Sequence, residues 1–251
     1  MSESKGSTIL LFDVDGTLTL PRQKMDRAMS NFLMEVHKAV PLGIVSGSDL
    51  PKIVEQLGES VEDVLSRFDY LFSENGLVSV SSKGTTFPMQ SIKHHLGEKQ
   101  LQKLINFALR EFSEMDLPAK RGNFIEFRNG MLNLSPIGRS CTQEERLQFV
   151  DYDKKHDVRQ KFVKKLQDFT EGWGLNVCIG GQISVDVFPC GWDKTYCLQF
   201  LNDFHTIYFF GDRTTPGGND YDLFIHPRTI GYTVKDPEDT RKQVRKLLES
   251  L

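Results

Sequence analysis

The sequence lacks the features that would place it in a membrane or on nucleic acid. No apolar run in the 251 residues approaches the length that spans a bilayer, and the start, MSESKGST, lacks the charged-then-apolar pattern of a signal peptide. The 31 basic and 34 acidic residues give a net charge of -3, without a Lys/Arg block of the kind that neutralises nucleic-acid phosphates. We therefore expect a cytoplasmic protein with neither a membrane nor a nucleic acid as its partner.

Cysteine and histidine are also sparse, which excludes two further classes. The cysteines form no C-x-x-C pair, and four in a chain of this size do not indicate a disulfide scaffold: Cys141, Cys178, Cys190 and Cys197. We expect them to be reduced and mostly buried. The six histidines have no zinc-ligand spacing, so none is assigned to a metal.

What is present are short apolar runs rich in branched and aromatic residues, which are typical of buried parallel strands. These runs are Ile9 to Phe12, Leu42 to Val45, Tyr70 to Phe72 and Thr206 to Phe210. Helical apolar stripes separate the first three, over Met25 to Ala39, Leu50 to Leu57 and Val61 to Phe68. Strands alternating with helices predict an α/β sheet, and its carboxyl edge would hold Asp13, Ser46 and Asp212.

The middle of the chain has a different pattern, with long helices and paired strands. We predict helices over Ile92 to Phe112 and Thr142 to Phe169, the second starting with a capping box of Thr142 and Glu145. In FIEFRNGMLNLS, Asn129-Gly130 predicts a two-residue type I′ turn with positive φ at both positions. The turn would pair Phe127 with Leu132, Glu126 with Asn133 and Ile125 with Leu134.

That register puts polar residues on one face of the hairpin, and QISVDVF repeats the alternation. The polar positions are Glu126, Arg128, Asn133, Ser135, Gln182, Ser184 and Asp186, while Ile125, Phe127, Leu132, Leu134, Ile183, Val185 and Val187 lie on the opposite face. We infer an inserted α+β domain with an open polar face, giving a core over 1–87, an insert over 88–189 and a return to the core over 190–251. A simply solvated sheet face is the alternative.

The motif D-x-D-G-T after the first strand suits phosphoryl transfer. Crowded carboxylates at the end of a buried strand are unfavourable unless a cation or a reaction uses them. Asp13 is the candidate nucleophile, which would form an aspartyl-phosphate. Asp15 would be the acid and base for the hydroxyl group. Mg²⁺ would be bound by Asp13, the Asp15 carbonyl and Asp212, because hard cations prefer oxygen ligands.

Three further segments complete the predicted constellation. Ser46 in IVSGSD could donate a hydrogen bond to a phosphoryl oxygen, with a role as a turn residue as the alternative. Lys194 in GWDKTY offers a positive charge to the transition state, with an exposed lysine at a helix start as the alternative. Asn219 and Asp220 lie behind Asp212 on the metal side. Four such loops at the ends of strands predict a functional site.

At these residues the sequence resembles the haloacid dehalogenase-like superfamily, in its branch of phosphatases and phosphomutases. The segments LFDVDGTLT, GSDL, SENGL, RGNFIEFRNGMLNLSPIGRSCTQEER, GGQISVDVFPCGWDKTYCL and FFGDRTTPGGNDYD resemble the eukaryotic phosphomannomutase family from about residue 8 onward. The resemblance implies a Rossmann-like parallel-sheet core of the haloacid dehalogenase type with an inserted α+β cap.

The resemblance also implies an activity: interconversion of mannose 6-phosphate and mannose 1-phosphate with Mg²⁺, primed by a hexose 1,6-bisphosphate. It implies a homodimer joined through the caps and a role in supplying GDP-mannose for glycosylation. The substrate positions of the family fall on Arg22, Arg128, Asn133, Arg139, Arg146, Ser184 and Asp186, and arginine binds phosphate through paired hydrogen bonds.

Some assignments within this resemblance stay open. Arg146 has an exposed surface role as its alternative, and Glu126 either touches sugar or pairs with an arginine. Phe224 and Thr229 lie where family members can hold a second cation, and this chain has His226 in the same loop. Many members carry glycine at Ser46, where either residue leaves a backbone N–H for the phosphate.

Two other functions would share part of this pattern. A sugar phosphatase would share the aspartyl-phosphate, but it has no need for an arginine-rich face that binds a second phosphate. A binding or scaffold protein with a dead site would have no need for Asp13, Asp15, Lys194 and Asp212 together.

Overall fold

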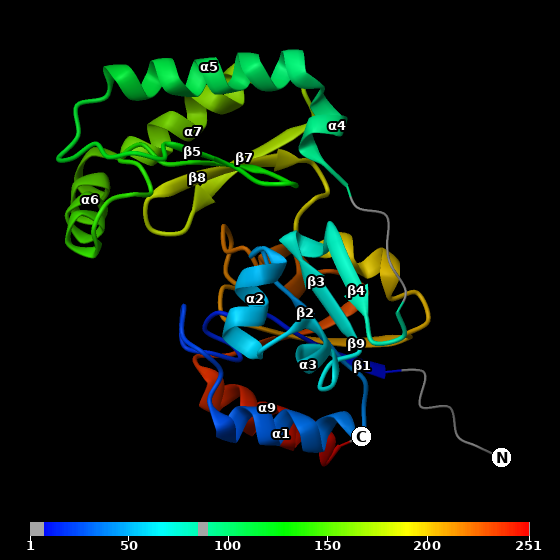
Figure 1. The fold of residues 1–251 in the computed structure, drawn as a ribbon. Coiled ribbons are helices and arrows are strands. Elements are labelled where there is room, and N and C mark those ends of the chain that lie inside the picture. The colour runs from blue at the N-terminus through cyan, green and yellow to red at the C-terminus, as the bar shows by residue number, and fades with distance from the viewer. Residues whose placement is uncertain (1–7, 85–89, 251) are drawn as a thin grey trace. The chain divides into compact units, whose positions relative to one another are not determined.

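The computed structural model describes residues 8–84 and 90–250, and it divides them into two compact units. The first unit comprises residues 8–84 and 191–250, and the second comprises residues 90–190 (Figure 1). The predicted boundary between residues 87 and 88 lies outside the described residues. At the other junction, the predicted insert ends at Pro189 and the second unit ends at Cys190.

The first unit is built on a six-stranded sheet with the order β10-β9-β1-β2-β3-β4. Its strands are β1 (Thr8–Phe12), β2 (Leu42–Val45), β3 (Tyr70–Ser73), β4 (Val78–Ser81), β9 (Thr206–Gly211) and β10 (Thr229–Thr233). All neighbours pair in parallel except β3 and β4, which are antiparallel. The predicted α/β class and the four predicted parallel strands are confirmed, whereas β4 and β10 were not predicted.

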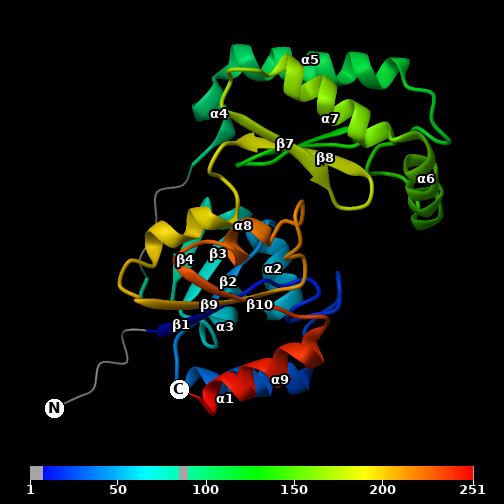
Figure 2. The same cartoon turned by 180° about the vertical axis from the view of Figure 1, so that it is seen from behind.

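Helices cover both faces of this sheet, because both faces are apolar. Leu10 and Phe12 of β1 point into a core with α1 (Arg27–His37), α2 (Leu50–Leu57), α3 (Val61–Leu65) and α9 (Pro237–Leu248). Ile9 and Leu11 point to the other face, against the 3₁₀ helix η2 (Lys194–Phe200) and α8 (Tyr221–Phe224). The helices α1 and α9, from opposite ends of the chain, lie side by side (Figures 1 and 2). The short 3₁₀ helix η1 (Glu74–Gly76) follows β3.

The second unit is an antiparallel sheet with the order β5-β6-β8-β7, which helices α5 and α7 cover on one face (Figure 2). Its elements are α4 (Ile92–Leu96), α5 (Glu98–Glu114), β5 (Ile125–Phe127), β6 (Leu132–Leu134), α6 (Gln143–His156), α7 (Val158–Phe169), β7 (Leu175–Gly180) and β8 (Ser184–Pro189). The predicted hairpin register is confirmed, with Glu126 opposite Asn133. The capping box of Thr142 and Glu145 is also present.

Three local predictions in this unit were wrong. Neither Asn129 nor Gly130 is among the described residues with positive φ, so the turn is not type I′. Instead the side-chain amide of Asn129 donates to the backbone carbonyl of Gln90, and the backbone carbonyl of Asn129 accepts from the Ile92 amide at 2.8 Å. Contacts with the segment that leads into α4 therefore determine the turn. The predicted long helices are each broken, at Gly97 with φ 74° and at Asp157 with φ 53°.

Burial also differs from the sequence patterns in places. Phe127, predicted on the covered face, is 51% exposed, while Asn133 and Ser184 on the polar face are 3% and 4% exposed. Asn133 and Ser184 are thus packed within the polar face, whereas Gln182 on the same face is exposed. Cys141 and Cys197 are buried as expected, but Cys178 and Cys190 are exposed. None of the helices in the described part of the chain is long and apolar enough to cross a membrane.

Candidate active site

The site of the first unit begins where three neighbouring parallel strands end. Asp13 follows β1, Ser46 follows β2, and Asp212 follows β9. The Asp13 amide donates to the Phe210 carbonyl at 2.9 Å, which continues the β1–β9 ladder into the site. Asp13 is 5% exposed. Parallel pairing thus brings together residues about 200 positions apart in sequence, as predicted from the strand pattern.

Lys194 joins this edge from η2. Its ammonium group donates to Oδ1 of Asp13 and, at 2.6 Å, to Oδ1 of Asp220, and the side chain is 1% exposed. Burial lowers the pKa of Lys194, but the attraction of Asp13 and Asp220 outweighs burial and raises that pKa above its ordinary value. The lysine is therefore a buried cation, and the alternative of an exposed lysine is wrong.

Three carboxylates remain close together beside this lysine. Oxygen atoms of Asp13, Asp212 and Asp220 lie within 4.8 Å of one another. Burial, opposed by Lys194 and reinforced by Asp220, raises the pKa of Asp13 to about 7, and burial with Asp220 raises the pKa of Asp212 to about 6. Oδ1 of Asp212 is buried without a hydrogen-bond partner. A buried cluster that resists ionisation and leaves an acceptor free fits an oxygen-preferring divalent cation.

Gly16 allows Asp212 to reach this cluster. Its φ is +84°, and a Cβ placed there would lie 2.5 Å from Oδ2 of Asp212. The Gly16 amide donates to the Thr19 carbonyl at 2.7 Å, which closes the tight loop after β1. The glycine of D-x-D-G-T is thus required both by the turn and by the close approach of the Asp212 carboxylate, which follows β9.

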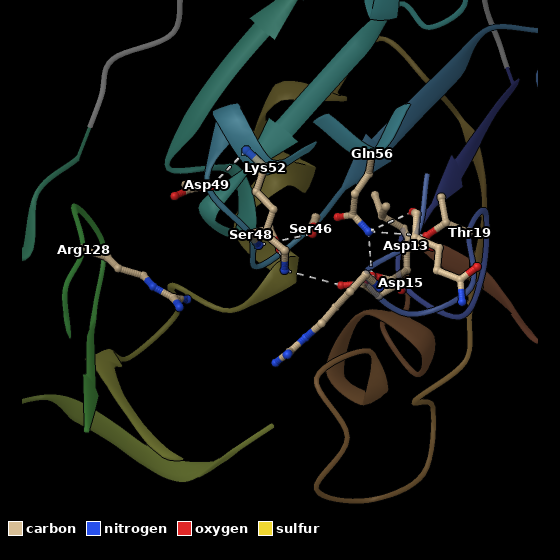
Figure 3. A network of polar contacts seen from close by, with 12 residues as sticks. Asp13, Asp15, Thr19, Ser46, Ser48, Asp49, Lys52, Gln56 and Arg128 are labelled. Atoms are coloured by element: carbon tan, nitrogen blue, oxygen red, sulfur yellow. Dashed lines mark hydrogen bonds and ion pairs between the residues drawn. The ribbon is translucent and has the colours of Figure 1, made fainter. Parts of the chain in front are cut away.

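Asp15 is positioned by the backbone of Arg22 and by two residues that the sequence patterns did not indicate, Gln56 and Lys52 (Figure 3). Its Oδ1 accepts from Nε2 of Gln56 at 2.8 Å and from the Arg22 amide at 2.7 Å, and its Oδ2 lies 3.7 Å from Nζ of Lys52. Gln56 is 5% exposed on the apolar side of α2. Gln56 is a polar residue within the apolar stripe of α2, and this was the signal in the sequence that could have pointed to it. Arg22 contributes its backbone amide in this loop, at φ 62°, and the residue is exposed.

The remaining candidate residues of the first unit have different surroundings. The Ser46 amide donates to the Phe72 carbonyl at 2.9 Å, so this N–H is already used, and the Ser46 hydroxyl accepts from the Ser48 amide at 3.2 Å, as a turn residue does. Asn219 is exposed. The Thr229 hydroxyl donates to the carbonyls of Leu223 and His226, and Phe224 packs against β10 at Gly231. These contacts do not bring Phe224 and Thr229 into the acidic cluster, and the second cation site stays a prediction.

In the second unit, the predicted residues form one hydrogen-bonded network. Asn133 Nδ2 donates to Oγ of Ser184 at 2.9 Å and to Oδ1 of Asp186 at 2.5 Å, while its Oδ1 accepts from Arg139 at 2.7 Å. Burial raises the pKa of Asp186, against the opposing effects of Asn133, Arg128 and Arg139. The hairpin and β8 therefore assemble polar atoms that are separated by about fifty residues in sequence.

Two arginines of this network share one carboxylate. Glu126 Oε2 accepts from Arg128 at 2.6 Å and lies 3.2 Å from Nε of Arg139. The open question about Glu126 is thereby answered in favour of pairing with arginine. Arg146 is half-buried, and its guanidinium donates to the Arg139 carbonyl at 3.3 Å, so it buttresses this arginine instead of lying free on the surface.

The fold places the chain in a recognisable class. It matches the IMP-bound, N-terminally truncated IMP-nucleotidase of Plasmodium falciparum with a TM-score of 0.63 and 15% identity, over 98% of this chain and 69% of that one. It matches a haloacid dehalogenase-like hydrolase from Bacteroides thetaiotaomicron with a TM-score of 0.58 and 12% identity, over 96% and 99%. The chain therefore has the haloacid dehalogenase-like fold, with an acidic site at the carboxyl edge of its parallel sheet.

Sequence relatives narrow this class to one family. The family model for eukaryotic phosphomannomutase matches residues 29–250. A probable phosphomannomutase of Caenorhabditis elegans is 60% identical over 100% of this chain and 99% of its own length, and the phosphomannomutase of Spinacia oleracea is 53% identical over 96% and 95%. The chain belongs to the eukaryotic phosphomannomutase family. The predicted function, phosphomannomutase, and the predicted enzyme class, an intramolecular phosphotransferase, are confirmed.

Proposed function

We propose that the chain interconverts mannose 6-phosphate and mannose 1-phosphate through a phosphorylated Asp13 and a hexose 1,6-bisphosphate. The observation that carries this proposal is the buried Asp13 carboxylate, held by Lys194 beside Asp212 and Asp220. A carboxylate fixed at the end of a buried strand is a suitable nucleophile for phosphorus. Family membership supports the two sugar phosphates as substrates.

Each core side chain then has a distinct role. Phosphorylated Asp13 donates its phosphoryl group to the free hydroxyl of the monophosphate, which gives the bisphosphate. After the bisphosphate has reoriented, Asp13 attacks the other phosphoryl group, so that the isomeric monophosphate leaves and the aspartyl-phosphate is restored. Lys194 opposes protonation of Asp13 and adds positive charge near the phosphoryl oxygens, where a metaphosphate-like transition state gathers negative charge. Asp15 deprotonates the accepting hydroxyl and later protonates the leaving one. Gln56 keeps the Asp15 carboxylate oriented through its 2.8 Å hydrogen bond.

The acidic cluster fits Mg²⁺ as the cofactor. Asp13, Asp212 and Asp220, with the Asp15 carbonyl and Asn219 nearby in sequence, would hold it, because the cluster supplies only oxygen donors and one of them has no partner in the protein. When bound, Mg²⁺ neutralises the charge between an attacking carboxylate and a phosphate dianion. Ser46 is proposed to contact a phosphoryl oxygen through its hydroxyl.

We propose that the second unit is the cap that binds the unreacting phosphate and the sugar. Arg128 and Arg139 would exchange their shared partner Glu126 for phosphate, and Arg146 would add positive charge in the same unit. Arg22, which lies in the first unit, is proposed as a further substrate-binding residue. Ser184, Asp186 and Asn133 would bind sugar hydroxyls, since a carboxylate accepts two hydrogen bonds and thereby selects an orientation.

The cellular setting is proposed on the same family membership. The enzyme would be cytoplasmic, would supply mannose 1-phosphate for GDP-mannose synthesis, and would form a homodimer through the second unit.

The test of the proposed function is phosphorus NMR of the protein with Mg²⁺, mannose 1-phosphate and a trace of glucose 1,6-bisphosphate. The mannose 1-phosphate signal should be replaced by that of mannose 6-phosphate, with little inorganic phosphate. Dominant release of inorganic phosphate would contradict the proposal, because it would mean that water and not a sugar hydroxyl accepts the phosphoryl group.

A further inference from the structure

The break between α6 and α7 creates a buried ion pair that the reaction described above does not use. Asp157 at the break is left-handed and makes no side-chain cap for α7. Instead Oδ1 of Asp153, on α6, accepts from the Arg159 amide at 2.8 Å, and Oδ2 accepts from Nε of Arg159 at 2.7 Å. The two side chains are 10% and 11% exposed. Asp153 therefore caps α7 from the preceding helix and fixes the direction of the Arg159 side chain.

The guanidinium group of Arg159 also contacts the turn between β7 and β8. Nη1 donates to the Gly181 carbonyl at 3.0 Å and to the Gly180 carbonyl at 3.3 Å. In a continuous helix the chain would not change direction here, and the Arg159 amide would be used within the helix instead of donating to Asp153. The break thus connects the helical layer with the start of β8.

This turn leads directly to the polar network of the second unit. The Gly180 carbonyl also accepts from the Ser184 hydroxyl at 3.1 Å. A Cβ placed on Gly180 would lie 2.3 Å from Oδ2 of Asp186, so the Gly180 backbone abuts that carboxyl group. Ser184 and Asp186 are joined in turn by the Asn133 amide. Movement of the Gly180 peptide would therefore shift both side chains.

We propose that Arg159, locked by Asp153, is a positioning residue that holds the β7–β8 turn so that Ser184 and Asp186 present their oxygens to the sugar hydroxyls. The proposal rests on the proposed function of Ser184 and Asp186 in binding the sugar. Arg159 acts through the Gly180 and Gly181 carbonyls and does not touch the substrate itself. A misplacement of about 1 Å is enough to weaken such contacts strongly.

The test uses the double variant Asp153→Asn/Arg159→Met, which removes the carbonyl contacts without leaving one charge buried alone. With saturating glucose 1,6-bisphosphate, we expect the KM for mannose 1-phosphate to rise about tenfold. Slow hydrolysis of acetyl phosphate should stay at the wild-type rate, because Asp13, Asp15 and Lys194 belong to the other unit. Arg159→Lys keeps the charge and one donor, and should restore part of the affinity.

The matched control is Leu166→Val, a conservative change at a fully buried position of α7 with no polar contact to the turn. It should lower thermal stability and leave KM unchanged, because partial unfolding reduces the apparent kcat rather than KM. Asp186→Asn tests the proposed function separately, and it should raise KM.

Two results would overturn the inference. If Asp186→Asn raises KM but the double variant stays within about twofold of wild type, the turn needs no support from Arg159 and the proposed function survives. If Asp186→Asn itself leaves KM unchanged, the sugar-binding role of this face fails, and the positioning role fails with it.

Discussion

Replacement of Lys194 tests the electrostatic arrangement of the core site most directly. Lys194→Met keeps much of the side-chain length but removes the positive charge between Asp13 and Asp220, leaving three clustered carboxylates that are buried or half-buried. Removing one partner of a buried ion pair destabilises a protein by about 3–5 kcal/mol. At about 2–4 °C per kcal/mol for domains of this size, the expected loss in Tm at pH 8 is roughly 6–20 °C.

The loss of stability caused by Lys194→Met should depend on pH, and the pKa values determine the direction of that dependence. In the wild type the folded-state pKa is about 7 for Asp13 and about 6 for Asp212, against an ordinary value of 3.8. Folded protein therefore binds more protons than unfolded protein between about pH 4 and 7, and the free energy of unfolding falls as pH rises through that window. Without Lys194 these pKa values rise further, so the extra destabilisation should be small near pH 5 and largest above pH 7.

The assay is thermal unfolding of wild type and variant in EDTA at pH 5 and pH 8. Lys38→Met is the control, since the ion pair of Lys38 with Glu35 is exposed and such pairs contribute little. Variant and wild type melting within about 2 °C of each other at pH 8 would refute the reasoning, because that corresponds to less than about 1 kcal/mol.

Three further predictions concern the reaction and the cation. Asp13→Asn should abolish mutase turnover and phosphorylation of the protein, measured with ³²P-labelled bisphosphate, and wild-type rates would exclude Asp13 as nucleophile. Arg128→Gln removes a charged hydrogen bond of about 1.5–3 kcal/mol, so the KM for mannose 1-phosphate should rise roughly ten- to hundredfold. Its hydrolysis of acetyl phosphate should be unchanged, and equal loss of both activities would indicate misfolding. Mg²⁺ should raise Tm more at pH 8 than at pH 5.5, because protons compete for Asp13 and Asp212; an equal shift at both pH values would place the cation elsewhere.

Strands, their pairing and the hairpin register were predictable because they depend on local sequence patterns. The alternation of apolar runs and helical stripes predicted β1, β2, β3 and β9 and their parallel pairing, since buried parallel strands need apolar residues on both faces. Parallel strands end at one edge, so the strand pattern alone was enough to place Asp13, Ser46 and Asp212 together. The register of the hairpin was likewise correct, because a two-residue loop leaves one pairing.

Other features depend on contacts between distant segments, which no local pattern contains. The Asn129-Gly130 turn adopts another type because its polar groups bond to the segment entering α4. The amide of Ser46 is used by the carbonyl of Phe72, and Glu126 is shared by two arginines. Each outcome was set by which partner lies within hydrogen-bonding distance after folding.

The sequence by itself determined the class of fold, the ends of the catalytic strands and the family, because periodicity and motif spacing are properties of neighbouring residues. Only the tertiary structure decided that Lys194 is buried between Asp13 and Asp220, that Gln56 orients Asp15, and that Arg159 reaches the β7–β8 turn. The physical reason is that a polar side chain acquires its pKa and orientation from desolvation and from partners that long-range packing brings to it.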